Sequence, residues 1–377
     1  MVNVLIGGDI YPRGNVLPYF KKGDVQSIFN DLFVEFEEAD LSIINLECPL
    51  IDVNTPIEKN GPVHGVKSEC INGLKNAKIY ILNLANNHIM DHGSTGLKNT
   101  IEVSAKAKML TVGAGENLNV ARQIIVKNVG KIRIGVLAVA EHEFSIATGN
   151  SWGANPLDLI DYVRNVRCQK DNFDYLIVLI HGGNEHYPFP SPRLKKVCRF
   201  MVEMGANAVV VQHTHCPGSY EEYQKAHIVY GQGNLIFDLP NQVKSFYEGF
   251  LVKLSITEDF SSTMNIVPYL QSNSQIGARK MDKEAEESFL CSFKKRSRSI
   301  LDDTFIQKEW LKFCEERKNA YLSSILGHNR LFSKLNTHGH LVKYFYTAKS
   351  LIRLQNFVSC ESHREVLETI FNHRMVE

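Results

Sequence analysis

Apolar and polar positions form alternating blocks along the first 270 or so residues. Short, largely apolar runs are typical of strands that are buried on both faces. Stretches with apolar residues three and four positions apart, such as Asp24–Glu38 and Ser191–Met204, are typical of amphipathic helices. Strands that alternate with helices predict an α/β sheet fold. The main expected strands are Val2–Ile6, Leu41–Leu46, Ile79–Leu84, Lys131–Ala140, Tyr175–Ile180, Ala208–Val211, Gly249–Thr257 and Thr263–Val267.

The pattern changes after about Asn273, where charged segments with helical spacing, such as Arg279–Phe293 and Asp302–Lys318, replace the strand signals. We therefore expect a domain boundary near 272–285, with one domain over residues 1–275 and a helical C-terminal region over 285–377. A further feature is the loop Cys48–Lys67, which is rich in proline and glycine. Long loops in compact domains often carry function.

Composition excludes several classes of protein. The 377 residues are 44% hydrophobic and 22% charged, with a net charge of +1, so nothing points to a nucleic-acid partner. No apolar run approaches about 18 residues, so no membrane span is expected. The eight cysteines are scattered without a C-x-x-C pair, which is typical of reduced thiols in a cytoplasmic protein. Met1–Ile6 lacks the features of a signal peptide and is expected to begin the first strand.

Polar side chains follow the predicted strands at the points where these strands end. The stretch Leu82–Gly96 leads from a strand through Asn86, Asn87 and His88 into a helix. Ligands bind open α/β sheets outside the carboxyl ends of the strands, so these residues are expected to meet. The other strand-end residues are Asp9, Glu47, His181, His213 and His215.

These residue types suit a site for divalent cations such as Mn, Zn, Fe or Mg. His213 and His215 are two positions apart, so both project to the same side of an extended backbone. A carboxylate is needed to bridge two cations, and Asp9 and Glu47 are the candidates. His88 points away from Asn87 and could serve as an acid beside the substrate. Taken singly, each residue could be a turn former, a helix cap or a buried polar group; the combination favours a metal site.

The motif series resembles the CapA/PgsA family of poly-γ-glutamate capsule synthesis proteins, which are similar in fold to calcineurin-like metallophosphoesterases. The resemblance covers roughly residues 2–270. The motifs are Gly7-Gly8-Asp9, Asn45-Leu46-Glu47, Asn86-Asn87-His88 with Asp91 and Gly93, His181-Gly182-Gly183 with Glu185, His213-x-His215, and Gly233-Asn234 with Phe237-Asp238.

The resemblance implies a four-layer αββα sandwich with two divalent metal ions. The ligands that it implies are Asp9, Glu47, Asn87, His181, His213 and His215. It implies His88 as the histidine on the substrate side and Glu185 as a further residue of the catalytic site. Asn234, together with Asn86, is expected to bind substrate.

The chain also departs from the pattern of calcineurin-like enzymes. Their first motif reads Asp-x-His, whereas Tyr11 stands at the histidine position here, so one ligand of the first metal site is missing. His186 stands where a tyrosine is usual and adds a possible ligand or catalytic acid. We expect that this site accepts an unusual substrate.

Three functions are compatible with these features. The first is a metal-dependent phosphoesterase that acts on a small or polymeric anionic substrate in capsule or cell-envelope polymer biosynthesis. The second is a hydrolase or transferase of amide or polyglutamate bonds that uses the same metals. The third is a non-catalytic accessory protein that works with other capsule or envelope biosynthesis proteins.

Overall fold

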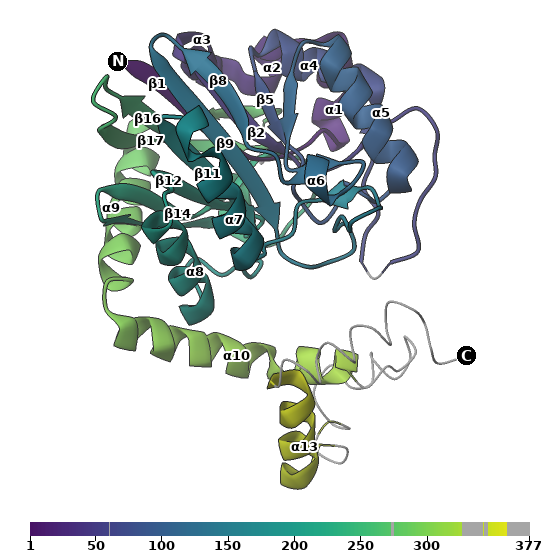
Figure 1. Ribbon diagram of the computed structural model, residues 1–377, viewed down its shortest axis with the longest axis vertical. Coiled ribbons are helices and arrows are strands. Elements are labelled where there is room, and N and C mark those ends of the chain that lie inside the picture. Colours follow the sequence, from purple (N-terminus) through teal and green to yellow (C-terminus); the bar gives the residue numbers. More distant parts are fainter. Residues whose placement is uncertain (60, 273–274, 326–341, 343–345, 360–377) are drawn as a thin grey trace. The chain divides into compact units, whose positions relative to one another are not determined.

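The computed structural model describes residues 1–59, 61–272, 275–325, 342 and 346–359 (Figure 1). Its contacts divide the chain into two compact units, Met1–Gln307 and Lys308–Glu377. The domain limits expected from the sequence, 1–275 and 285–377, stay predictions. Helices are present in the described C-terminal residues, as expected: α9 (Lys283–Ser299), α10 (Asp303–Ile325) and α13 (Ala348–Ser359).

One sheet contains eight strands around β1 (Val2–Tyr11). Along its first half, β1 pairs in parallel with β2 (Leu41–Leu46) and antiparallel with β16 (Glu248–Ile256). From Asp9 onward, β15 (Asn234–Phe237) takes the place of β16 and runs parallel to β1. Asp9 is therefore flanked by Asn45 on one side and Asn234 on the other. The remaining strands are β5 (Ile81–Asn83), β6 (Leu110–Val112), β17 (Ser262–Gln271) and β18 (Ala278–Lys280).

The second sheet has six strands in the order β13-β14-β12-β11-β9-β8. Four neighbouring strands of this sheet are parallel, and the two outer strands are antiparallel to their neighbours. The bounds are β8 (Ile125–Val129), β9 (Ile132–Ala140), β11 (Tyr175–His181), β12 (Ala208–Gln212), β13 (Pro217–Tyr223) and β14 (Ala226–Gln232). Two short pairs lie outside both sheets: β3 (Leu50–Ile51) with β4 (Val66–Lys67), and β7 (Ala114–Gly115) with β10 (Gly153–Ala154).

The two sheets face each other across one apolar core, and helices cover their outer faces (Figure 1). Strand β11 shows the arrangement because successive side chains of a strand point to opposite faces. Tyr175, Ile177 and Leu179 enter the core between the sheets. Leu176, Val178 and Ile180 instead pack with α7 (Leu159–Gln169) and α8 (Pro192–Glu203). The layers therefore follow the order helix, sheet, sheet, helix, which confirms the predicted four-layer α/β sandwich.

The helical segment predicted over Asp24–Glu38 is broken in two at Asn30. Asp24 is the N-cap, as expected, and its carboxylate accepts a hydrogen bond from the Ser27 backbone N–H. Asn30 has a φ of 46° and its side chain donates to the carbonyls of Ile276 and Ala278, which ends the first helix. The helices before α7 are α1 (Leu17–Lys22), α2 (Val25–Phe29), α3 (Phe33–Glu38), α4 (Ile71–Asn76), α5 (Gly93–Lys106) and α6 (Leu118–Ala121).

The helix predicted over Arg279–Phe293 begins later than expected. Residues 278–280 form the edge strand β18, and Asp282 caps the helix at the backbone N–H of Ala285. Phe289 and Phe293 of this helix pack edge-on against Phe250 of β16. This packing joins α9 to the sandwich and explains why the first compact unit extends beyond the strands.

No helix in the described part of the chain combines the length and the apolar character needed to cross a membrane. The cysteines of the described residues are all free thiols.

Candidate metal centre

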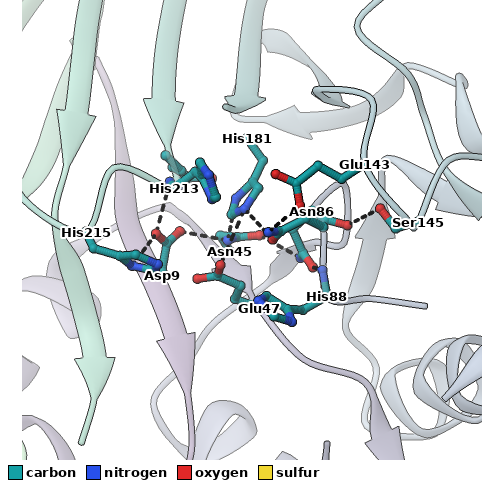
Figure 2. Close-up of polar contacts among 12 residues, drawn as sticks. Asp9, Asn45, Glu47, Asn86, His88, Glu143, Ser145, His181, His213 and His215 are labelled. Atoms are coloured by element: carbon teal, nitrogen blue, oxygen red, sulfur yellow. Dashed lines mark hydrogen bonds and ion pairs between the residues drawn. The ribbon is translucent and has the colours of Figure 1, made fainter. Parts of the chain in front are cut away.

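The strand-end residues predicted from the sequence meet at one edge of the sandwich (Figure 2). One sheet supplies Asp9 from β1, Glu47 after β2, and Asn87 and His88 after β5. The other sheet supplies its histidines at the ends of β11 and β12. The centre is therefore built from both sheets, and its geometry depends on how they face each other.

Four groups of donors among the described residues could each hold a metal ion, and two of the four share Glu47. The two that share it are Asp9–Glu47–His215 and Glu47–His181–His213, and the ligand atoms within each group all lie within 4.8 Å of one another. A further group, His64–His88–Asp91, lies beside them. The amide oxygen of Asn87 lies 3.0 Å from Nε2 of His181, which places it with the second group. Carboxylate, amide and imidazole ligands suit Mn, Fe and Zn. A carboxylate common to both groups is what a bridged pair of cations needs.

Glu47 is the most unusual member of the centre. It is fully buried, and neither carboxylate oxygen has a hydrogen bond in the described structure. Its Oε1 lies 3.4 Å from Nε2 of His181. Burial, together with the charge of Asp9, raises the pKa of the Glu47 carboxyl to about 8. Buried charges in proteins are paired or coordinate metals, so this carboxyl fits a cation that would balance it.

The histidines of the second group are held in the form that binds metals. Burial lowers the pKa of His181 to about 4, and burial lowers the pKa of His213 well below its ordinary value. Both rings are therefore neutral near pH 7 and keep a lone pair for a cation. Burial alone would lower the pKa of His215 as well. The Glu47 and Asp9 carboxylates outweigh this effect and raise the pKa of that ring.

The backbone after β12 is strained where it presents its two histidines. His213 has a φ of 91° and His215 a φ of 51°, values that non-glycine residues rarely adopt. The backbone N–H of His213 donates to Oδ2 of Asp9 at 3.0 Å, which ties this turn to β1 in the other sheet. Strained residues cluster at functional sites because the surrounding structure holds them in place.

Asn45 organises the centre, and the sequence analysis did not single it out as a site residue. Its amide donates to Oδ1 of Asp9 at 2.7 Å and lies 3.2 Å from Nδ1 of His181. Asn86 donates in turn to the side-chain oxygen Oδ1 of Asn45 at 3.0 Å. Period-two alternation along β2 places Asn45 on the same face as Glu47, which was the available signal.

Asp91 holds the ring of His88 through the nitrogen Nδ1. This nitrogen lies 2.6 Å from Oδ2 of Asp91. Lys59 and the backbone N–H of His64 also donate to this carboxylate, at 2.5 and 2.6 Å. Burial would raise the pKa of Asp91, but the hydrogen bonds from His88, Lys59 and His64 outweigh it and lower that pKa. The charged carboxylate fixes the ring orientation of His88 and leaves its Nε2 for other partners.

A column of stacked rings supports His88 from the long loop. The ring of His64 stacks on that of His88 with 3.8 Å between centroids, and Tyr11 stacks on His64 at 4.2 Å. Tyr11 therefore packs in the column instead of replacing the histidine that the Asp-x-His motif would supply. His64 and Lys59 were missed because an irregular loop has no periodicity that would mark individual residues.

Asn86 and Asn234, which are expected to bind substrate, make several hydrogen bonds within the protein. The Asn86 amide donates to the Leu46 carbonyl at 2.8 Å as well as to Asn45, and it accepts from the His88 backbone N–H. Asn234 accepts from Nδ1 of His215 at 2.7 Å and donates to a backbone carbonyl. Both residues are fully buried. Their amides hold neighbouring residues in position, and substrate binding by these two residues stays a prediction.

The remaining predicted residues lie on the loop after β11. Glu185 is exposed, and its carboxylate lies within 4.8 Å of ligand atoms of His213 and His215. The rings of His186 and His215 are 6.2 Å apart, so His186 lies beside the centre and not within either donor group. On the facing loop, Glu143 accepts from the Asn87 amide at 3.0 Å, a contact that the sequence analysis missed.

Gly8 permits the close strand approach that places Asp9. A Cβ at this position would lie 2.1 Å from the carbonyl oxygen of Gly233. We expect Gly8→Ala to lower the free energy of unfolding by about 1–3 kcal/mol, because the backbones must separate. Urea unfolding measures the change. Gly149→Ala is the matched control, since a Cβ there meets nothing within 4 Å. Equal losses in both variants would contradict the close-approach argument.

Comparisons with known proteins identify relatives that cover most of the chain. A capsule biosynthesis protein, CapA of Bacillus anthracis, is 29% identical over 271 residues, which are 69% of this chain and 65% of the relative. The PGA biosynthesis protein CapA of Bacillus subtilis is 30% identical over 236 residues, 61% of this chain and 62% of the relative. The chain thus spans slightly less than two thirds of each relative. A solved phosphatase structure from Mycoplasma pneumoniae has a TM-score of 0.46 at 14% identity, over 71% of this chain and 93% of that one.

The family comparison covers more than half of the chain. The model of the bacterial capsule synthesis protein family, PGA_cap, matches residues 3–239, and this segment contains every member of both donor groups. The protein with this fold and this cluster of carboxylates and histidines therefore belongs to the bacterial capsule synthesis protein family PGA_cap.

Proposed function

We propose that the protein is a metal-dependent hydrolase that cleaves phosphoester bonds in the biosynthesis of a capsule or cell-envelope polymer. One observation carries the proposal: two donor groups share a buried carboxylate without hydrogen bonds, Glu47, beside the His88–Asp91 pair. The polymer context rests on the relatives, whose names place them in capsule and PGA biosynthesis.

Asp9, Glu47 and His215 would hold one cation, and Glu47, Asn87, His181 and His213 the second. Such cations lower the pKa of water and neutralise charge on a phosphoryl group. The protein's part is to fix the donors before substrate arrives. Asn45 does this by bonding Asp9 and approaching His181, so one amide links donors from both sheets.

His88 would supply the proton to the leaving oxygen. Asp91 accepts from Nδ1, which favours the tautomer and orientation in which Nε2 faces the reaction. Lys59 and the His64 backbone N–H keep Asp91 charged, and the Asp91 carboxylate holds the ring of His88 in place. Proton transfer of this kind contributes about 10²–10⁴-fold to a rate.

Metal analysis and a substrate panel test the proposal together. Purified full-length protein is expected to contain up to two Mn, Fe or Zn ions per chain, and His181→Ala should lose at least one of them. The metal-loaded protein should turn over phosphomonoesters or phosphodiesters, and the His181→Ala variant should not. If the wild-type protein binds no divalent cation, or His181→Ala keeps its full metal content, the proposed centre is wrong.

The same panel decides between the alternative functions. Turnover of poly-γ-glutamate or simple amides, with phosphoesters inert, would favour the amide hydrolase or transferase. Bound metal with every ester and amide inert would favour an accessory protein that has kept the fold.

A further inference from the structure

The two donor groups are unequal in size. The group around His181 has four donors once Asn87 is included, whereas the group around His215 has three. Tyr11, the next side chain after Asp9 that β1 could direct to this edge, stacks on His64 instead. The three-donor group is therefore short of one protein ligand relative to its neighbour.

Glu185 lies beside this incomplete group. Its carboxylate, His213 and His215 form a third set whose ligand atoms all lie within 4.8 Å of one another. The backbone beside Glu185 is held in place, because the N–H of the next residue, His186, donates to the Thr214 carbonyl at 2.8 Å. Thr214 lies between the two histidines, so the loop is tied to the segment that carries them. This tie joins two backbone groups and does not depend on any side chain of the loop.

A second observation concerns His213, which belongs to this third set and also to the group around His181. Nδ1 of His213 is buried and has no hydrogen-bond partner in the described structure, and the His213 residue is only 7% exposed. Glu185 itself forms no salt bridge with a described lysine or arginine. An anionic carboxylate next to an unpaired imidazole nitrogen favours a shared cation over a direct contact.

We propose that Glu185 is an additional metal ligand that completes the group of Asp9, Glu47 and His215, to which it is linked by their common neighbour His215. The inference rests on the proposed metal-dependent function and deepens it by naming a ligand and a metal preference. The completed group would have three carboxylates and one imidazole, and such oxygen-rich sites suit Mn or Mg. The other group, with two imidazoles, suits Zn or Fe better. The two sites are therefore expected to differ in the metals that they prefer.

The test is a titration of the metal-free protein with Mn²⁺. Calorimetry measures the heat of binding, and the electron paramagnetic resonance signal measures the Mn²⁺ that stays free. Wild-type protein should bind two ions. Glu185→Gln should weaken one of the two by at least tenfold and leave the other unchanged. Glu185→His should restore binding at the weakened site with a shift in preference from Mn²⁺ toward Zn²⁺.

Glu141→Gln is the matched control. Glu141 lies at the same end of the sandwich and accepts from the Gly183 backbone N–H at 3.0 Å, but it belongs to none of the donor groups. Its variant should bind two ions as the wild type does. Two unchanged sites in Glu185→Gln would overturn the role of Glu185 and leave the metal centre standing. A wild-type protein that binds no Mn²⁺, Zn²⁺ or Fe²⁺ would overturn both.

Discussion

Replacing His88 by alanine is expected to lower turnover of an alkyl phosphoester by about 10²–10⁴-fold, the range typical of a general acid. The reason is the geometry around the ring, which Asp91 holds at Nδ1 while His64 stacks on its face. Metal bound by the two groups that share Glu47 should not change, because His88 belongs to neither of them. Steady-state kinetics at saturating substrate and metal analysis of the same sample measure both quantities.

Comparing substrates with different leaving groups shows whether His88→Ala removes a proton donor or damages the structure in general. An aryl phosphoester with an acidic leaving group needs little protonation, so His88→Ala should slow its cleavage much less than that of the alkyl ester. His142→Ala is the control, because His142 is exposed on the loop after β9 and should leave both rates unchanged. Equal losses for both substrates, or a loss of bound metal, would contradict the proposed role of His88.

The sequence predicts the fold well where a strand is buried on both faces by apolar neighbours. Strand β11 lies in the middle of its sheet and is buried on both faces, and its apolar run marks it clearly. The errors occur where a tertiary contact overrides a local pattern. Asn30 interrupts a regular helical pattern because its side chain bonds carbonyls some 250 positions away. Residues 278–280 have no strand signal of their own and become a strand by pairing with β17.

The candidate site was predictable to the extent that its residues end strands. Parallel strands bring their carboxyl ends to one edge, so Asp9, Glu47 and His181 could be grouped without a structure. Residues that act from loops were not found. Lys59 and His64 reach Asp91 only through the path of the long loop, and no spacing in the sequence encodes that path.

A buried polar network holds the two sheets in register beneath the centre. The amide of Gln212, at the end of β12, donates to the Gly7 carbonyl of β1 at 2.9 Å. Asn83 at the end of β5 donates to the side-chain oxygen Oε1 of Gln212 at 3.0 Å. Gln232 donates to the Ile6 carbonyl at 2.8 Å. Such satisfied networks specify one packing arrangement, and here that arrangement sets the distances between donors of opposite sheets.

Replacing Glu47 by glutamine is expected to remove metal binding from both donor groups, because this side chain is common to them. The amide of glutamine is neutral and a poorer ligand, and it cannot bridge two cations as a carboxylate does. In wild-type protein, metal at one hundred times its Kd stabilises the fold by about 2.7 kcal/mol. Glu47→Gln should lose that stabilisation, so added Mn²⁺ should no longer raise its melting temperature.

The order of stabilities should reverse when the metal is removed. In EDTA, wild-type protein retains a buried carboxyl group with no hydrogen bond, and Glu47→Gln is expected to melt at the same or a higher temperature. Glu35→Gln is the control, because Glu35 is also buried but pairs with Lys253 and Lys280. That variant should lose stability in both conditions and keep its response to Mn²⁺. A Glu47→Gln variant that is less stable than wild type in EDTA would show that Glu47 serves the fold and not a metal.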